Sequence, residues 1–123
     1  MKNIGENIKV SFKRIYNAFF YSIAGLKSMY ASEQAFRQDL LIFSAGILLL
    51  IFADVSKTEK TVMMVSLFLL LMAETVNTAI ETVVDRISKE YHPLSKKAKD
   101  IGSFLVLLAI INLSMVWAII LFF

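Results

Sequence analysis

The stretch that decides the fold is TVMMVSLFLLLMAETVNTAIETVV, residues 61–84. It contains no lysine, arginine, glycine or proline, but it includes Glu74, Asn77 and Glu81. About 20 predominantly apolar residues are enough for a helix to cross a bilayer. We therefore expect a membrane-spanning helix over residues 61–84 that carries polar side chains inside the membrane.

Two further apolar segments accompany this helix. Residues 34–53 are charged only at Arg37 and Asp39, and residues 101–123 carry no charge. The uninterrupted apolar part of the first segment runs from Leu40 to Ala53, so its charged first turns are expected at headgroup level. The 123-residue chain is 58% hydrophobic, with a mean hydropathy of +0.68. We predict a single all-α membrane domain with three transmembrane helices.

Residues 1–30 follow a different pattern. Apolar side chains recur every three or four positions from Ile4 to Leu26, and Lys9, Lys13 and Arg14 interrupt them. This pattern is typical of an amphipathic helix that lies in the membrane interface, with its cations toward the headgroups. The alternative is a helix packed on a soluble partner.

The distribution of lysine and arginine predicts the orientation. Six of these residues precede or include Arg37, five lie in the connection 85–100, and two lie in the connection 54–60. The positive-inside rule then places the N-terminus and the longer connection in the cytoplasm. The same distribution argues against nucleic acid as a partner, despite a net charge of +3. Without cysteine the chain has no disulfide, and its single histidine cannot build a zinc site.

The polar residues of segment 61–84 share one helix face. At about 100° per residue, Glu74, Asn77, Glu81 and the following Asp85 fall within an arc of about 80°. An ionisable side chain at the bilayer centre costs at least about 2.5 kcal/mol, so such residues usually face protein or water and serve a function. A buried polar residue can also fix helix register, but this stripe holds more polar groups than that role needs.

This stripe has the groups that phosphoryl transfer requires. Glu81 lies about one turn from the cytoplasmic end, where it can hold a Mg²⁺ that arrives with a nucleotide. Glu74 lies about 10 Å deeper by helical rise and is suited to general base work. Asn77 can orient a substrate hydroxyl or the neighbouring carboxylate, and Glu33 supplies a third carboxylate at interface depth.

The second connection ends in KKAKD (96–100), where Lys99 and Asp100 could bind a phosphate. Composition alone favours a simpler interpretation, in which these lysines only set the orientation. His92 precedes Pro93, which favours a loop with a solvated histidine. No glycine-rich phosphate loop is present, so side chains and metal must build any phosphate site.

The segment AETVNTAIETVVDRISKEYHPLSKKAKD (73–100) resembles the signature of the prokaryotic diacylglycerol kinase family, E-x-x-N-[ST]-A-[IV]-E-x-x-V-D. The stretches SEQAFRQDL (32–40) and GSFLVLLAIINLSMVWAIIL (102–121) also fit, and the similarity runs from about Arg14 to the end. The resemblance implies a homotrimer that transfers the γ-phosphate of Mg-ATP to a lipid hydroxyl in the bacterial inner membrane, without a phosphoenzyme.

The resemblance also implies roles for matched residues. Glu74 matches the catalytic base, Asn77 the asparagine beside it, and Glu33 and Glu81 the carboxylates that hold Mg²⁺. The implied nucleotide contacts are Arg14, Tyr21, Glu33, Glu81, Glu90, Tyr91, His92, Lys99 and Asp100. The implied positions at or near the lipid are Arg14, Ser22, Ala35, Phe36, Arg37, Gln38, Asp39, Glu74, Ser103 and Trp117.

Three departures from the family pattern bear on the substrate. Asp39 stands where a glutamate is common, and Ile23 and Ala24 replace a familiar Trp-Lys pair. Pro93 resembles the Gram-positive branch, which phosphorylates undecaprenol, whereas SEQAFRQ and VVDR are closer to the diacylglycerol branch. We expect diacylglycerol as the substrate, with undecaprenol as the alternative. The other classes considered are a small proton-coupled transporter and a structural membrane subunit.

Overall fold

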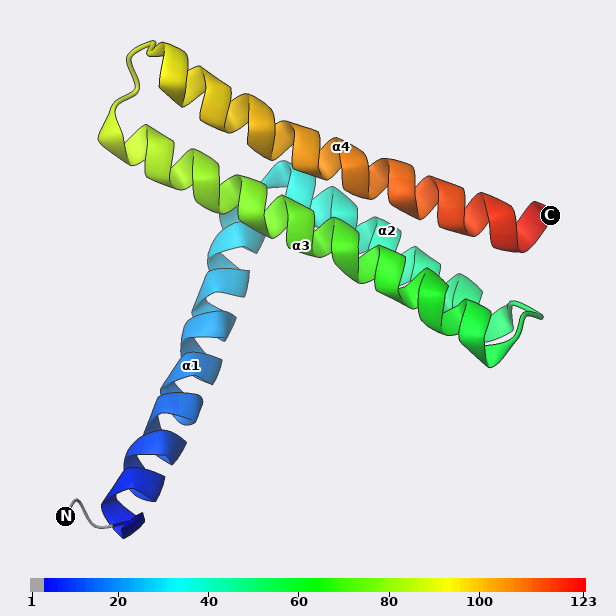
Figure 1. Cartoon of the computed structure of the whole chain (residues 1–123), viewed down its shortest axis with the longest axis horizontal. Coiled ribbons are helices and arrows are strands. Elements are labelled where there is room, and N and C mark those ends of the chain that lie inside the picture. The colour runs from blue at the N-terminus through cyan, green and yellow to red at the C-terminus, as the bar shows by residue number, and fades with distance from the viewer. Residues whose placement is uncertain (1–3) are drawn as a thin grey trace. The chain divides into compact units, whose positions relative to one another are not determined.

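The structure is a computed structural model that describes residues 4–123, with side chains described from residue 8 onward. Its four helices are α1 (Ile4–Ser32), α2 (Gln34–Phe52), α3 (Lys57–Ile87) and α4 (Pro93–Phe122), shown in Figure 1. The described residues form no strand. The predicted all-α fold is confirmed, while the beginning of the predicted helix 1–30 lies outside the described residues.

The chain divides into two units, each described by itself. The first unit holds α1, and the second comprises residues 33–123 with α2, α3 and α4. Helix α1 has 29 residues, among which Phe12, Ile15 and Phe19 are exposed aromatic or aliphatic side chains. An apolar stripe that nothing in its own unit covers is typical of a helix that binds an interface.

The three helices of the second unit are each long and apolar enough to cross a membrane. Helix α2 has 19 residues, and its length of about 28 Å matches a hydrocarbon core of about 30 Å. Helix α3 has 31 residues and is about 46 Å long, so it extends beyond the hydrocarbon. The prediction of three membrane-spanning helices is confirmed.

Most of the predicted connection over residues 85–100 is helical. Helix α3 continues to Ile87 and α4 begins at Pro93, which leaves only residues 88–92 as the link. Pro93 occupies the first turn of α4, where a missing backbone N–H costs nothing. The Nδ1 atom of His92 accepts a hydrogen bond from the Leu94 backbone N–H at 3.2 Å, so His92 caps the helix.

A capping box starts α3. The Ser56 hydroxyl accepts a hydrogen bond from the Glu59 N–H at 3.2 Å, and the Glu59 carboxylate accepts one from the Ser56 N–H at 2.7 Å. Two backbone donors that lack a partner within the helix are thereby satisfied. This cap explains why α3 begins at Lys57 and the connection from α2 is only four residues long.

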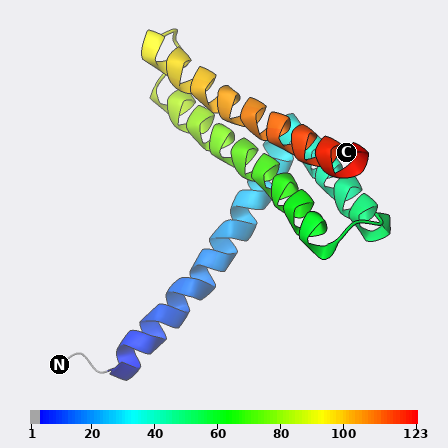
Figure 2. The ribbon, with the colours of Figure 1, turned by 45° about the vertical axis from the view of Figure 1, so that its right-hand side comes forward.

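Helix α3 forms the core of the second unit, because it packs against both α2 and α4. Leu50 of α2 meets Met63 and Leu67 of α3, with Trp117 of α4 beside them. Leu70 and Ala73 pack against Ala109 of α4, and α3 and α4 run side by side in both Figure 1 and Figure 2. The buried face of α3 is therefore the face that continues into the polar stripe.

One polar contact crosses the apolar core. The indole Nε1 of Trp117 donates to the Ser66 hydroxyl oxygen at 3.2 Å, and this hydroxyl donates to the Met63 carbonyl at 2.6 Å. Ser66 is fully buried. The chain therefore satisfies the one polar atom of Trp117 inside a region that contains little water.

Candidate active site on the polar face of α3

Burial falls steadily along the polar stripe of α3. The side chains of Glu74 and Asn77 are buried, at 6% and 9% exposure, whereas Glu81 is half-buried and Asp85 is exposed. Glu74 lies about 10 Å from Glu81 and about 16 Å from Asp85 along the helix. The stripe therefore leads from an enclosed carboxylate to the open end of the helix.

Asn77 links the two halves of this stripe. Its Nδ2 group donates a hydrogen bond to Oε1 of Glu81 at 3.4 Å, which is long for such a bond. Its Oδ1 atom is buried and has no hydrogen-bond partner among the residues that the structure describes. A buried acceptor without a partner costs free energy, so it indicates either a functional demand or a constraint from its neighbour.

Other carboxylates lie close enough to affect Glu74. These are Asp39 on the second turn of α2, Glu81 on α3 and Glu33 just before α2. No group of three or more His, Cys, Asp or Glu side chains in the described part of the chain is arranged to hold a metal ion. Mg²⁺ needs only one or two protein carboxylates when phosphate oxygens complete its shell, so the hard oxygens of Glu33 and Glu81 fit it chemically.

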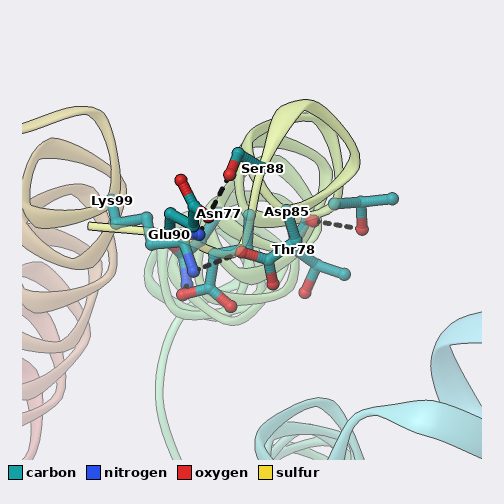
Figure 3. A network of polar contacts seen from close by, with 8 residues as sticks. Asn77, Thr78, Asp85, Ser88, Glu90 and Lys99 are labelled. Atoms are coloured by element: carbon teal, nitrogen blue, oxygen red, sulfur yellow. Dashed lines mark hydrogen bonds and ion pairs between the residues drawn. The ribbon is translucent and has the colours of Figure 1, made fainter. Parts of the chain in front are cut away.

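A cleft of about 250 Å³ lies at the end of the α3–α4 hairpin. The Lys99 ammonium reaches across from α4 to the Asp85 carboxylate at 2.6 Å, as Figure 3 shows. Lys96 pairs with Asp100 at 2.5 Å on α4, beside the same cleft. The residues that line this cleft are Val84, Asp85, Ser88, Lys89, Glu90, Tyr91, His92, Ser95, Lys96, Lys99 and Asp100.

The structure brings most of the predicted nucleotide residues into this cleft. Glu90, Tyr91, His92, Lys99 and Asp100 all line it. The Glu90 backbone N–H is held by the Ser88 hydroxyl at 3.0 Å, which fixes the turn (Figure 3). A cleft with an aromatic ring, ammonium groups and carboxylates offers contacts for a base, a phosphate and a ribose.

The remaining predicted nucleotide residues lie elsewhere. Glu81 is one turn deeper than Asp85 on α3, and Glu33 lies at the N-terminus of α2. Arg14 and Tyr21 lie on α1, which is described by itself. Their predicted contacts with a nucleotide stay predictions.

The predicted lipid positions fall into separate groups. Ala35, Phe36, Arg37, Gln38 and Asp39 form the first turns of α2, where Phe36 is buried and Ala35 and Gln38 are exposed.

Two more positions lie on α4, and two on α1. Ser103 is exposed, and Trp117 lies about 21 Å further along the same helix, so one headgroup cannot contact both within this unit. Arg14 and Ser22 lie on α1, where the Ser22 hydroxyl donates to the Ala18 carbonyl at 2.9 Å. All of these lipid roles stay predictions.

Three residues that hold another residue in place had no role in the sequence prediction. Asp85 was recognised only as a member of the stripe, although it holds Lys99. Gly102 faces Asn77 across the helix contact, and Ser66 holds Trp117. The position of Asp85 on the stripe was an available signal, whereas the two other pairs join residues far apart in sequence and leave no local pattern.

These features define a small helical membrane protein with a buried acidic stripe that points to a charged cleft. A sequence profile described as Prokaryotic diacylglycerol kinase matches residues 20–121. The chain belongs to this family, and it is a membrane kinase of lipid metabolism. The resemblance seen in the sequence is confirmed, and the transporter and structural-subunit alternatives are not supported.

Curated relatives agree with this assignment. The chain is 44% identical over 109 residues to a diacylglycerol kinase of Pseudomonas aeruginosa, covering 89% of each protein. It is 40% identical over 115 residues to a diacylglycerol kinase of Escherichia coli, covering 94% of each. A diacylglycerol kinase of Haemophilus influenzae is 42% identical over 109 residues, which are 89% of this chain and 92% of that protein.

Proposed function

We propose that this protein transfers the γ-phosphate of ATP to the hydroxyl of diacylglycerol, giving phosphatidic acid and ADP. The observation that carries the proposal is the buried carboxylate of Glu74 on a stripe that ends at a charged cleft. A lipid hydroxyl reaches the stripe from the membrane, and a nucleotide reaches the cleft from water. The names of the relatives support this choice of lipid.

In the proposed reaction Glu74 takes the proton of the lipid hydroxyl. The hydroxyl oxygen then forms a bond to the γ-phosphorus, while the bond between that phosphorus and the β–γ bridging oxygen breaks. The electron pair of the broken bond leaves with ADP. Asn77 orients the neighbouring carboxylate of Glu81 through its Nδ2 group, and the Lys99 ammonium offsets negative charge on the phosphates.

Glu33 and Glu81 are the residues that would hold Mg²⁺, because both offer the hard oxygen ligands that this ion prefers. When bound, the ion would neutralise charge on the phosphate oxygens during transfer. The nucleotide would lie in the cleft at the α3–α4 hairpin, with Glu90, Tyr91 and His92 beside it. Arg14 and Tyr21 of α1 complete the proposed nucleotide contacts.

The proposed assembly is a homotrimer with active sites shared between protomers. The three membrane helices leave many large apolar side chains exposed, among them Met72, Val76 and Leu108. A single α2–α4 unit is also too thin to enclose a lipid and a nucleotide together. Self-association would cover this apolar surface and add walls to the site.

The proposed location is the bacterial inner membrane, with the N-terminus in the cytoplasm and α1 as a surface helix. The link 88–92 and the first turns of α4 contain Lys89, Lys96, Lys97 and Lys99, which favours the cytoplasmic side for this end. ATP would then reach the cleft directly. The whole chain acts as one domain in this proposal.

A substrate panel tests the proposal. Purified protein in mixed micelles receives Mg²⁺, ATP labelled at the γ-phosphate, and one of diacylglycerol, monoacylglycerol, ceramide or undecaprenol. We expect label in the organic phase with diacylglycerol at a higher kcat/KM than with the other lipids. A preference for undecaprenol would contradict the proposed substrate, and no labelled lipid in any arm would contradict the proposed reaction.

A further inference from the structure

Gly102 of α4 lies directly against Asn77 of α3. A Cβ atom at Gly102 would overlap Oδ1 of Asn77, and the next two atoms it would meet are Cγ at 3.4 Å and Cα at 3.6 Å of the same residue. Both residues are buried. Only a residue without a side chain allows this approach of the two helices.

This contact explains the orientation of the Asn77 amide. The buried Oδ1 atom, which lacks a partner among the described residues, points at the hydrogen that replaces the side chain of Gly102. Nδ2 points instead toward Oε1 of Glu81. The reversed amide would place its NH₂ group against aliphatic hydrogens and its carbonyl against a carboxylate, so it would lose a hydrogen bond and gain a repulsion.

We infer that Gly102 is a positioning residue, which fixes the Asn77 amide so that Nδ2 donates to Glu81. The inference rests on the proposed metal role of Glu81. A hydrogen bond to one oxygen of a carboxylate orients its other oxygen, and loss of such a partner typically lowers metal affinity or activity about 10- to 100-fold. Gly102 thus acts on the phosphate site without contacting a substrate.

The neighbouring residues of α4 limit how the helix can yield to a larger side chain. Lys99 precedes Gly102 by almost one turn and is tied to Asp85, so it faces α3 as well. Ala109, two turns after Gly102, is packed against Leu70 and Ala73. Because α4 contacts α3 on both sides of Gly102, an added methyl group would displace the Asn77 amide more readily than it would separate the two helices.

The first experiment measures lipid phosphorylation by Gly102→Ala at saturating ATP over a range of free Mg²⁺. We expect the Mg²⁺ concentration for half-maximal rate to rise about tenfold, because the Asn77–Glu81 hydrogen bond is disturbed. The KM for the lipid should stay within about twofold, because Gly102 does not contact the lipid in this proposal. A folded Gly102→Ala protein with the wild-type Mg²⁺ requirement would overturn the inference.

Gly46→Ala is the matched control. Gly46 is also a buried helix glycine, and a Cβ there would lie 2.8 Å from Cδ1 and Cδ2 of Leu67, which are apolar atoms. It should lower the melting temperature but leave the Mg²⁺ requirement unchanged. An equal rise in the Mg²⁺ requirement in both variants would assign the effect to general loosening and refute a specific role for Gly102.

A second experiment does not depend on metal binding or on catalytic activity. The melting temperature in detergent is measured without nucleotide or Mg²⁺ for wild type, Gly102→Ala, Asn77→Ser and the double variant. If the methyl group acts on Asn77, then Gly102→Ala should lower the melting temperature in the wild-type background. In the Asn77→Ser background, the same substitution should leave the melting temperature nearly unchanged. If Gly102→Ala alone does not fold, recovery of folding in the double variant supports the inference, and failure to recover overturns it.

Glu81→Gln separates this inference from the proposed function. A raised Mg²⁺ requirement in Glu81→Gln together with an unchanged one in Gly102→Ala would refute only the role of Gly102. An unchanged requirement in Glu81→Gln would refute the metal assignment itself. The melting-temperature cycle between Gly102 and Asn77 still reports their contact in that case.

Discussion

The Lys99 ammonium on α4 lies 2.6 Å from the Asp85 carboxylate on α3, so one ion pair bridges the two walls of the cleft. The pair is only partly shielded, with side-chain exposures of 38% and 49%. A partly exposed pair contributes little to stability. The pair fixes the position of the Lys99 ammonium at the cleft where we propose that the nucleotide binds.

Asp85→Asn should therefore change ATP binding more than folding. The variant loses the partner that holds Lys99, so we expect the KM for ATP to rise about threefold, with a melting temperature close to that of wild type. Steady-state kinetics at saturating diacylglycerol measure this. Asp54→Asn, an exposed aspartate in the α2–α3 link, is the control, and an equal effect in both variants would argue against a specific role for Asp85.

Glu74→Gln should abolish lipid phosphorylation. The amide cannot accept the hydroxyl proton, so we expect kcat to fall at least about 100-fold. Glutamine has the same size, and the helical circular dichroism and melting temperature should stay near wild type. Turnover of labelled lipid at the wild-type rate would rule out Glu74 as the base.

Glu81→Gln should change the metal requirement rather than the proton transfer. The variant keeps the Asn77 neighbour but loses a negative ligand, so the free Mg²⁺ for half-maximal activity should rise about tenfold or more. A high concentration of Mg²⁺ should restore part of the kcat of Glu81→Gln, whereas it should not restore the kcat of Glu74→Gln. An identical Mg²⁺ titration for wild type and variant would exclude the metal role.

Ser66→Ala should destabilise the membrane unit. The Trp117 N–H would lose the Ser66 hydroxyl as its acceptor in an apolar region, and we expect a loss of about 1 kcal/mol of unfolding free energy. Reversible unfolding in mixed micelles measures this for Ser66→Ala, Trp117→Phe and the double variant. A coupling free energy of zero between the two positions would mean that the hydrogen bond does not stabilise the fold.

The number of helices and the acidic stripe could be predicted because each depends on one segment at a time. Hydropathy marked the apolar stretches, and helical spacing placed Glu74, Asn77 and Glu81 on one face. Hydropathy marks which segments are apolar, but it does not show at which residues the helices begin and end. Charged residues such as Lys96 and Asp100 lie within α4, so the helix extends into the predicted connection over 85–100.

The contacts between helices could not be predicted from the segments. Whether Gly102 meets Asn77, or Lys99 meets Asp85, depends on how α3 and α4 are rotated about their own axes. That rotation follows from the packing of residues such as Ala73 and Ala109. In the sequence, nothing distinguishes these alanines from the other apolar residues of their helices. The nucleotide roles proposed for residues near 90–100 came from the family resemblance, because composition alone favoured lysines that only set the orientation.

The short link over residues 88–92 has a consequence for biogenesis. Helices α3 and α4 form an antiparallel pair that can enter the bilayer together during synthesis, as a helical hairpin. Every residue that lines the cleft lies between positions 84 and 100, so its contacts have low sequence separation and require little loop-closure entropy. We expect this half of the site to form early, before the N-terminal helices reach their final places.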